Sequence, residues 1–397
     1  MSNINIVPDS RHSEYIYPLT SLRFFAAALV FILHADNHGL VSLAPFSFFD
    51  LSKAVSFFFL LSGFVLTYAY GNCRIYLPKF YISRFLRIWP ITCLSLLLTL
   101  ILLPDYIYLP GPVSQFSHGA VLLTNILCIQ SLIPIPSFYF AFNAVAWSVS
   151  VELIFYALFP YLTVLSFRAL TKILFLNITF VVIFLFLSVP LPFYPTSPHL
   201  YDQIMLHGLF YINPGARLPE FILGILTCKL FQSNLMPFVR ERINSIFLHS
   251  RILVILGKSL GSLLCFLLVL IALSAYLPIG IPYDSAKLIL SQFKSGIFFS
   301  LFILVLLTWP SYLSSFLSSR LFLVLGETSF SFYLFHQLFL IKSSQLGGIV
   351  LFGIQILPPN IVVVFLWSLS VSFITYYCFE KPFKYHLSQK IFGFLNT

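Results

Sequence analysis

A few charged and histidine side chains stand inside strongly apolar segments of this chain, and these residues could do chemistry. His34 is a candidate general base, because a neutral imidazole can accept a proton near neutral pH. Glu152 lies in apolar surroundings, where an isolated carboxylate would be very costly, so we expect it to have a partner. Arg84 and Arg87 are three residues apart on one predicted helix face, and paired guanidinium groups suit phosphate oxygens. A histidine, a glutamate and a pair of arginines together would allow acid–base chemistry beside a phosphorylated ligand.

Each of these residues also has a structural interpretation. Arg84 and Arg87 could mark the cytoplasmic side of a helix or bind lipid headgroups, and His34 could pack between helices. Arg23 precedes His34 by 11 residues, which separates them by about 16 Å along a helix. We therefore expect an arginine zone near the cytoplasm and a His/Glu zone near the outer side.

Two further pairs share a helix face by their spacing. Ser148 precedes Glu152 by four residues and could orient its carboxylate. Arg217 and Glu220 are three apart and could simply pair with each other.

The composition decides which kind of element carries these residues. Of 397 residues 59% are hydrophobic and only 9% are charged, far below the roughly one quarter typical of soluble domains. The net charge of +10 suits cytoplasmic loops of a membrane protein, and no aromatic–basic platform indicates a nucleic-acid partner. None of the six cysteines forms a C-x-x-C pair, and no spacing indicates a metal site, a P-loop or a nucleotide fingerprint. We expect an all-α integral membrane protein.

Eleven apolar runs are candidate membrane spans, since a span needs about 20 mostly apolar residues. They cover residues 20–36, 54–71, 87–104, 116–133, 144–166, 171–190, 217–233, 259–279, 289–309, 321–341 and 361–379.

Loop charge reduces the eleven runs to about ten crossings. Basic residues cluster after the second run and make that loop cytoplasmic by the positive-inside rule. If run 116–133 crossed, Arg168 and Lys172 would lie outside, so we expect this run to be re-entrant or interfacial. Both termini are then cytoplasmic. We expect a cytoplasmic segment at 1–19, a transmembrane domain at 20–380 and a cytoplasmic tail at 381–397.

The motifs in their order resemble a known family. "SLRFFAAALVFILHA" carries Arg23 and His34, "FYISRFLRIWP" carries the R-x-x-R pair, and "WSVSVELIFYALFP" carries S-x-x-x-E. "SFFFLLSGFVLTY", "SFSFYLFHQLF" with His336, and "FEKPF" complete the set. Together they resemble membrane acyltransferase family 3, which includes bacterial O-antigen and other polysaccharide O-acetyltransferases. The resemblance covers nearly the whole chain.

The resemblance implies an activity and a location. It implies an O-acetyltransferase of the bacterial inner membrane that moves an acyl group from cytoplasmic acyl-CoA to a hydroxyl of a cell-surface polysaccharide or lipid-linked glycan, such as the O-antigen of lipopolysaccharide. Acetyl is the acyl group that the resemblance leads us to expect. The partners are then acyl-CoA, the glycan and membrane lipids, and acetyl-CoA is a donor substrate with no permanently bound cofactor. A transporter or flippase of lipid-linked sugars or small molecules is the alternative, because it could use the same buried charges.

The resemblance also assigns roles to residues. It makes the basic-x10-His, R-x-x-R and S-x-x-x-E motifs the functional ones, which puts Ser148 among the functional residues. We expect Arg84 and Arg87 to bind the phosphates of the acyl donor, and Arg23 to bind the donor or to anchor its helix. We expect His34 to be the base, or to carry the acyl group itself, with Glu152 orienting it. The remaining candidates have supporting or acceptor-binding roles, such as sugar stacking for the tryptophan: Trp147, His336, Arg217 and Glu220.

Overall fold

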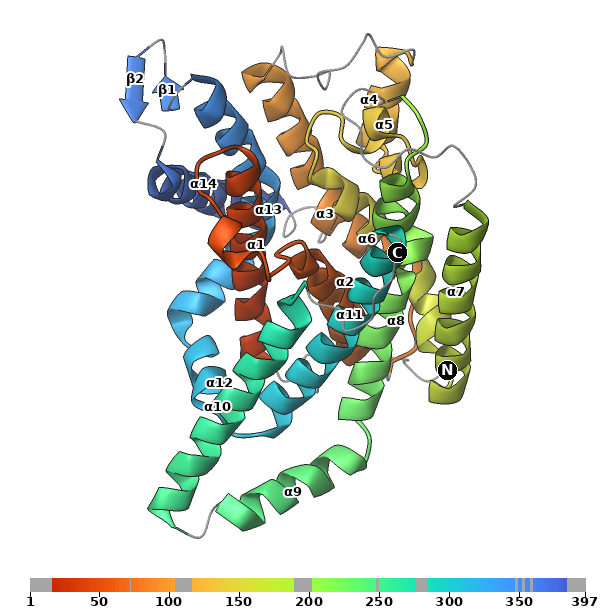
Figure 1. Cartoon of the computed structure of the whole chain (residues 1–397), viewed down its shortest axis with the longest axis vertical. Coiled ribbons are helices and arrows are strands. Elements are labelled where there is room, and N and C mark those ends of the chain that lie inside the picture. The colour runs from red at the N-terminus through yellow and green to blue at the C-terminus, as the bar shows by residue number, and fades with distance from the viewer. Residues whose placement is uncertain are drawn as a thin grey trace, which may run out of the picture.

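The protein is a bundle of long helices, seen here in a computed structural model (Figure 1). The structure describes residues 16–71, 73–103, 116–188, 202–247, 250–275, 284–346, 349–351, 354–357 and 360–383. The long helices are α1 (Tyr17–Asn37), α2 (Lys53–Tyr70), α3 (Leu77–Leu102), α6 (Ala146–Thr163), α7 (Phe167–Ser188), α8 (Pro214–Phe231), α10 (Arg251–Leu273), α11 (Asp284–Thr308), α13 (Arg320–Leu346) and α14 (Ile361–Thr375), which runs on into η5 (Tyr376–Glu380).

These helices confirm the all-α membrane fold. Within the described residues, eight are long and apolar enough to span a membrane, and α8 also qualifies when it is taken with the helix that follows it. The 27-residue α13 is long enough but less apolar, because it carries Arg320, Glu327 and Lys342. With α13 counted, the crossings agree with the expected number of about ten.

The interior and the rim of the bundle differ in burial. Within the 18-residue apolar stretch of each helix, 67% of the residues of α2 and 61% of those of α6 are buried, whereas only 22% are buried in α7 and in α10. The exposed side chains of α7 and α10 include Phe175, Leu176 and Phe266, which suit contact with lipid tails. The chemistry must therefore lie among the central helices.

Glycines allow two close helix contacts at the centre. A Cβ on Gly63 of α2 would lie 2.2 Å from the Phe221 carbonyl oxygen of α8, and one on Gly224 would lie 2.0 Å from the Leu60 oxygen. A Cβ on Gly326 of α13 would lie 2.2 Å from the Thr20 oxygen of α1. Small residues permit such backbone approach between membrane helices.

The α1–α13 pair also tests the number of crossings. Gly326 meets Thr20 near the start of α1, and His336 meets His34 near its end, so the two helices run parallel. Successive crossings alternate in direction, so seven of them between α1 and α13 give parallel helices, while an eighth would make them antiparallel. The run 116–133 indeed forms only short helices, α4 (His118–Ile126), η3 (Gln130–Leu132) and, beyond it, α5 (Pro136–Tyr139).

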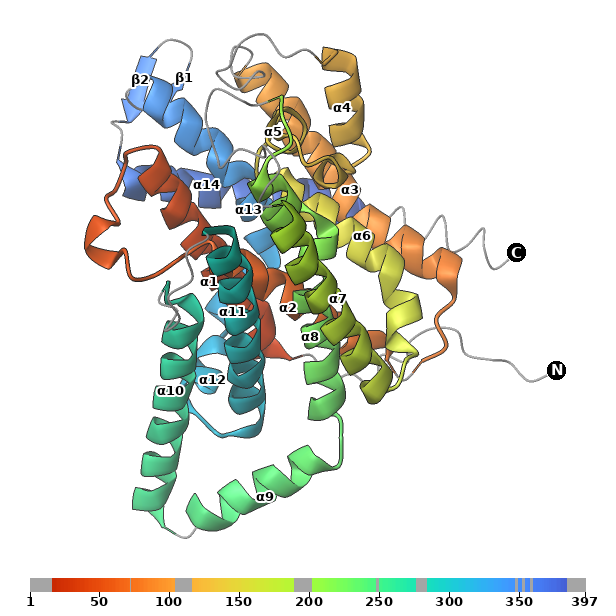
Figure 2. The ribbon, with the colours of Figure 1, turned by 45° about the vertical axis from the view of Figure 1, so that its right-hand side comes forward.

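Several elements differ from the expectations. Helix α3 starts at Leu77, ten residues before the expected run, because the basic residues on its first turns lower apolarity without breaking a helix. The sequence did not predict η1 (Ala44–Phe46), η4 (Gly208–Ile212), α9 (Leu235–Phe247), α12 (Tyr312–Leu317) or the hairpin of β1 (Ile349–Leu351) and β2 (Ile354–Leu357). Helix α9 lies across the ends of α8 and α10 in both views (Figures 1 and 2). The segments expected at 1–19 and 381–397 fall mostly outside the described residues.

Candidate functional site

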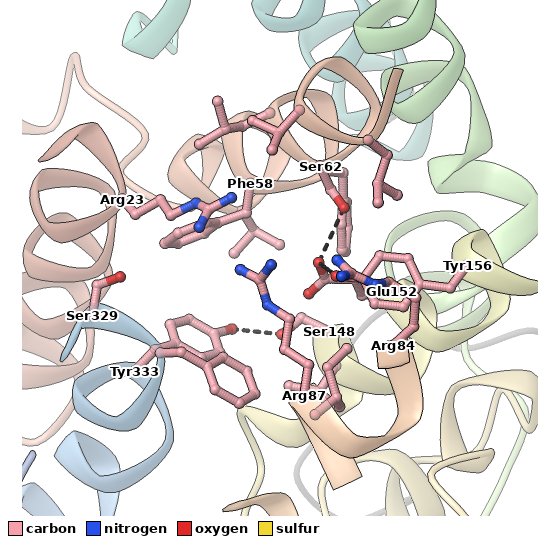
Figure 3. A pocket seen from close by; sticks show the side chains of 18 of the residues that line it. Arg23, Phe58, Ser62, Arg84, Arg87, Ser148, Glu152, Tyr156, Ser329 and Tyr333 are labelled. Carbon is pink, nitrogen blue, oxygen red and sulfur yellow. Dashed lines mark hydrogen bonds between the residues drawn. The ribbon is translucent and has the colours of Figure 1, made fainter. Parts of the chain in front are cut away.

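A cavity opens between the central helices near the end where α1 starts. The space between its walls, counted together with the part that is open to solvent, is about 940 Å³. The walls come from α1, α2, α3, α6, α13 and η5. Five residues singled out from the sequence line it: Arg23, Arg84, Arg87, Ser148 and Glu152. Segments far apart in the chain, from Arg23 to Glu380, thus line the space that holds the predicted donor residues (Figure 3).

The arginines approach the cavity from two sides. Figure 3 shows the guanidinium groups of Arg23 and Arg87 pointing toward the same space, with Arg84 beside Glu152. The guanidinium carbon of Arg84 lies 5.8 Å from the ring centre of Tyr70 and 5.9 Å from that of Tyr156. Among the described residues, neither Arg84 nor Arg87 forms an ion pair with a carboxylate. The three arginines thus face the cavity together with the carboxylates of Glu152, Glu327 and Glu380.

Glu152 has partners other than the two that the sequence suggested. Its Oε1 accepts a hydrogen bond from Ser62 Oγ at 3.0 Å and one from the Tyr156 hydroxyl at 2.5 Å. In the described structure it bonds neither His34 nor Ser148. The expectation that Glu152 orients His34 is thus corrected: the carboxylate belongs to the arginine cavity.

Ser148 faces a different helix from the one expected. Its Oγ donates to the Val145 carbonyl oxygen at 2.9 Å and lies 2.8 Å from the Tyr333 hydroxyl on α13. The Tyr333 ring also packs edge-on against Phe58, with ring centres 5.6 Å apart. Ser148 therefore links α6 to α13 instead of orienting Glu152.

The two histidines form a pair beyond the cavity. His34 Nδ1 lies 2.9 Å from His336 Nε2, and the rings stack at an angle of 10°. His336 Nδ1 lies 2.7 Å from the Tyr333 carbonyl oxygen, and the residue is 0% exposed. Both nitrogens of His336 are therefore engaged, which leaves none for the acceptor-binding role suggested from the sequence. Tyr333 both lines the cavity and contacts the pair, so it lies between them.

Arg217 and Glu220 form the ion pair that their spacing allowed. Arg217 Nε lies 3.2 Å from Glu220 Oε2, and the two side chains are 0% and 1% exposed. The guanidinium carbon lies 5.1 Å from the Phe59 ring centre and 4.7 Å from that of Tyr211. Neither member of the ion pair lines the cavity, so the pair packs the core instead.

Trp147 is likewise a packing residue in this structure. It is 6% exposed, and its ring centre lies 6.3 Å from Phe59 and 5.3 Å from Tyr211. The expected stacking on a sugar would need this ring to leave the core.

Several cavity residues were not assigned roles from the sequence: Ser62, Tyr156, Glu327, Tyr333 and Glu380. Tyr156 had a usable signal, because it lies four residues after Glu152 on the same face. Glu380 accepts from Ser331 Oγ at 2.9 Å, and Glu327 from the Tyr376 hydroxyl at 3.3 Å. Among the described residues, no three His, Cys, Asp or Glu side chains are placed to hold a metal ion.

Known proteins similar to this chain agree with the motifs. The family model described as "Acyltransferase domain" matches residues 16–377. A relative, acyltransferase MdmB of Streptomyces mycarofaciens, is 30% identical over 230 residues, which are 54% of this chain and 57% of that protein. The match thus spans little more than half of the relative's length, and no solved structure matches. Because the family model covers nearly the whole chain, the protein belongs to membrane acyltransferase family 3.

Proposed function

We propose that this protein is a membrane O-acyltransferase that moves an acetyl group from acetyl-CoA to a hydroxyl of a cell-surface polysaccharide or lipid-linked glycan, such as O-antigen. The observation that carries the proposal is the arginine cavity on one side of Tyr333 and the histidine pair on the other. The family and the relative's name, an acyltransferase, support group transfer. The acetyl group and the glycan follow from the family resemblance.

The cavity suits the phosphorylated end of the donor. Coenzyme A carries several phosphate groups, and arginines bind phosphate oxygens with charge-assisted hydrogen bonds. Arg23, Arg84 and Arg87 would hold these phosphates, while Glu152 keeps Tyr156 in place beside them. The pantetheine arm would then pass Tyr333 toward His34, over the distance of about 16 Å that the helix rise sets between Arg23 and His34.

The transfer step follows from the chemistry of a thioester. The acceptor oxygen attacks the thioester carbonyl carbon as His34 takes the hydroxyl proton. The carbon–sulfur bond then breaks, and the CoA thiolate leaves and receives that proton. In a two-step variant, the acyl group first moves to His34, which releases CoA, and then to the acceptor hydroxyl.

The orientation in the membrane follows from the loop charges. We place the cavity mouth and both termini on the cytoplasmic side of a bacterial inner membrane, where acyl-CoA is available. His34, near the far end of α1, then lies toward the outer leaflet, where a glycan acceptor could reach it.

One assay tests this function against a transporter or flippase of lipid-linked sugars. Purified protein in lipid vesicles should transfer radiolabelled acetyl from acetyl-CoA to an extracted surface glycan. His34→Ala should abolish this transfer, whereas His118→Ala, in the short helix α4 and outside both the cavity and the histidine pair, should retain it. A transporter would move label across the vesicle without forming an ester. Undiminished esterification by His34→Ala would overturn the catalytic assignment.

A further inference from the structure

The histidine pair carries an inference about which atom of His34 reacts. We propose that His336 is a positioning residue that fixes the tautomer of His34, so that the lone pair of His34 lies on Nε2. This rests on the proposed function, in which His34 receives the acceptor proton or the acyl group.

The first step is the contact of His336 with the backbone. Its Nδ1 lies 2.7 Å from the Tyr333 carbonyl oxygen. A carbonyl oxygen can only accept a hydrogen bond, so this nitrogen must carry the hydrogen. A neutral imidazole has one N–H group, so Nε2 of a neutral His336 is an acceptor.

The second step passes this constraint to His34. The acceptor nitrogen of His336 lies 2.9 Å from His34 Nδ1, so His34 must donate from Nδ1. The other nitrogen of His34, Nε2, then holds the free lone pair. Nε2 makes no hydrogen bond with a described residue, and the His34 side chain is partly exposed.

The surroundings of His336 favour its neutral form. It is 0% exposed, and its ring lies 6.1 Å from the Phe31 ring centre and 6.0 Å from that of Phe332. Burying an imidazolium among apolar rings costs free energy unless an anion compensates it. The described structure places no carboxylate in hydrogen-bond contact with this ring. The resting pair is therefore neutral, with the donor and acceptor order given above.

This order gives the reaction a defined proton path. His34 Nε2 receives the proton of the glycan hydroxyl as the hydroxyl oxygen attacks the thioester carbonyl. It returns that proton to the CoA thiolate when the carbon–sulfur bond breaks. Throughout, His34 Nδ1–H keeps donating to His336, which disperses the positive charge. His336 thus takes the role that a carboxylate has in many His-based sites.

Matched variants of His336 test the role. His336→Leu removes the acceptor, so kcat should fall about 100-fold, the lower range for general-base catalysis, with KM for acetyl-CoA nearly unchanged. His336→Gln keeps a side-chain hydrogen-bond acceptor, so its kcat should be at least about tenfold higher than that of His336→Leu. Gln337→Leu, the same kind of change at the next residue, should leave kcat near wild type. Equal loss of kcat in His336→Leu and His336→Gln would overturn the proposal.

A spectroscopic measurement determines the tautomer of His34 independently of any acyl transfer. The chain has nine histidines, so a ¹⁵N-histidine spectrum of the wild type in lipid, minus that of His34→Ala, isolates the signals of His34. We expect a protonated Nδ1 and an unprotonated Nε2 at neutral pH. The opposite tautomer would overturn the inference even if acyl transfer is observed. The expected tautomer without any acyl transfer would instead count against the proposed function.

Discussion

The Tyr156 hydroxyl donates to Glu152 Oε1 at 2.5 Å, from one turn further along the same helix. Ser62 Oγ on α2 donates to the same oxygen at 3.0 Å. Two hydroxyl donors thus fix the carboxylate in the cavity wall near Arg84 (Figure 3). The glutamate of the S-x-x-x-E motif thus belongs to the cavity wall, and the serine of that motif makes no hydrogen bond to it.

Removing the hydroxyl groups that donate hydrogen bonds to Glu152 should weaken the binding of acetyl-CoA. Hydrogen bonds to charged groups contribute about 1.5–3 kcal/mol, so Tyr156→Phe should raise KM for acetyl-CoA at least about tenfold. Ser62→Ala should act in the same direction. Steady-state kinetics at saturating acceptor measure this. Tyr161→Phe, with an exposed tyrosine on the same helix, is the matched control and should change KM less than twofold. A fall in kcat with unchanged KM would instead place Glu152 at the reacting atoms.

These contacts mark the limit of what the sequence could predict. Apolar length and loop charge were sufficient for the long membrane-spanning helices and for the non-crossing run 116–133, but not for short elements such as α9 and α12. Spacing along one helix correctly suggested the Arg217–Glu220 pair, because both residues belong to the same element. It failed for Ser148, because a helix face says nothing about which neighbouring helix supplies the partner.

The same limit explains the histidine pair. His34 and His336 are 302 residues apart, and no periodicity within α1 or α13 indicates their contact. The close approach at Gly326 and the parallel course of the two helices bring them together. Three-dimensional packing therefore replaced the expected His34–Glu152 contact with a His34–His336 contact.

The arginine pair should recognise a particular phosphate of the donor. Acetyl-dephospho-CoA lacks the 3′-phosphate, and the wild type should bind it about 10- to 100-fold more weakly if one charge-assisted contact is lost. An Arg84→Ala/Arg87→Ala variant should discriminate much less between the two donors, because the contact is already absent. Competition binding of both donors measures the four affinities. Arg168→Ala, an exposed arginine on α7, should keep the wild-type discrimination. Unchanged discrimination in the double variant would remove Arg84 and Arg87 from the donor site.

The Ser148–Tyr333 contact should appear as coupling between two mutations. Ser148 Oγ and the Tyr333 hydroxyl lie 2.8 Å apart, and the Val145 carbonyl oxygen lies 2.9 Å from the first and 3.4 Å from the second. Ser148→Ala and Tyr333→Phe each break the same bond, so the double variant should be less destabilised than the sum of the singles, by about 1 kcal/mol. Denaturant unfolding of the four proteins in detergent measures the free energies. Strict additivity would mean that the contact contributes nothing to stability.

The buried ion pair of Arg217 and Glu220 should matter for folding and not for donor binding. Removing one member leaves the other charge buried without compensation, so Arg217→Met should cost about 3–5 kcal/mol. An Arg217→Met/Glu220→Leu variant removes both charges and should recover most of that stability. Thermal unfolding in detergent ranks these proteins, with Arg242→Met on the exposed face of α9 as the control. If the double variant is stable and binds acetyl-CoA but fails to acylate the acceptor, the pair acts on the acceptor and the structural assignment is wrong.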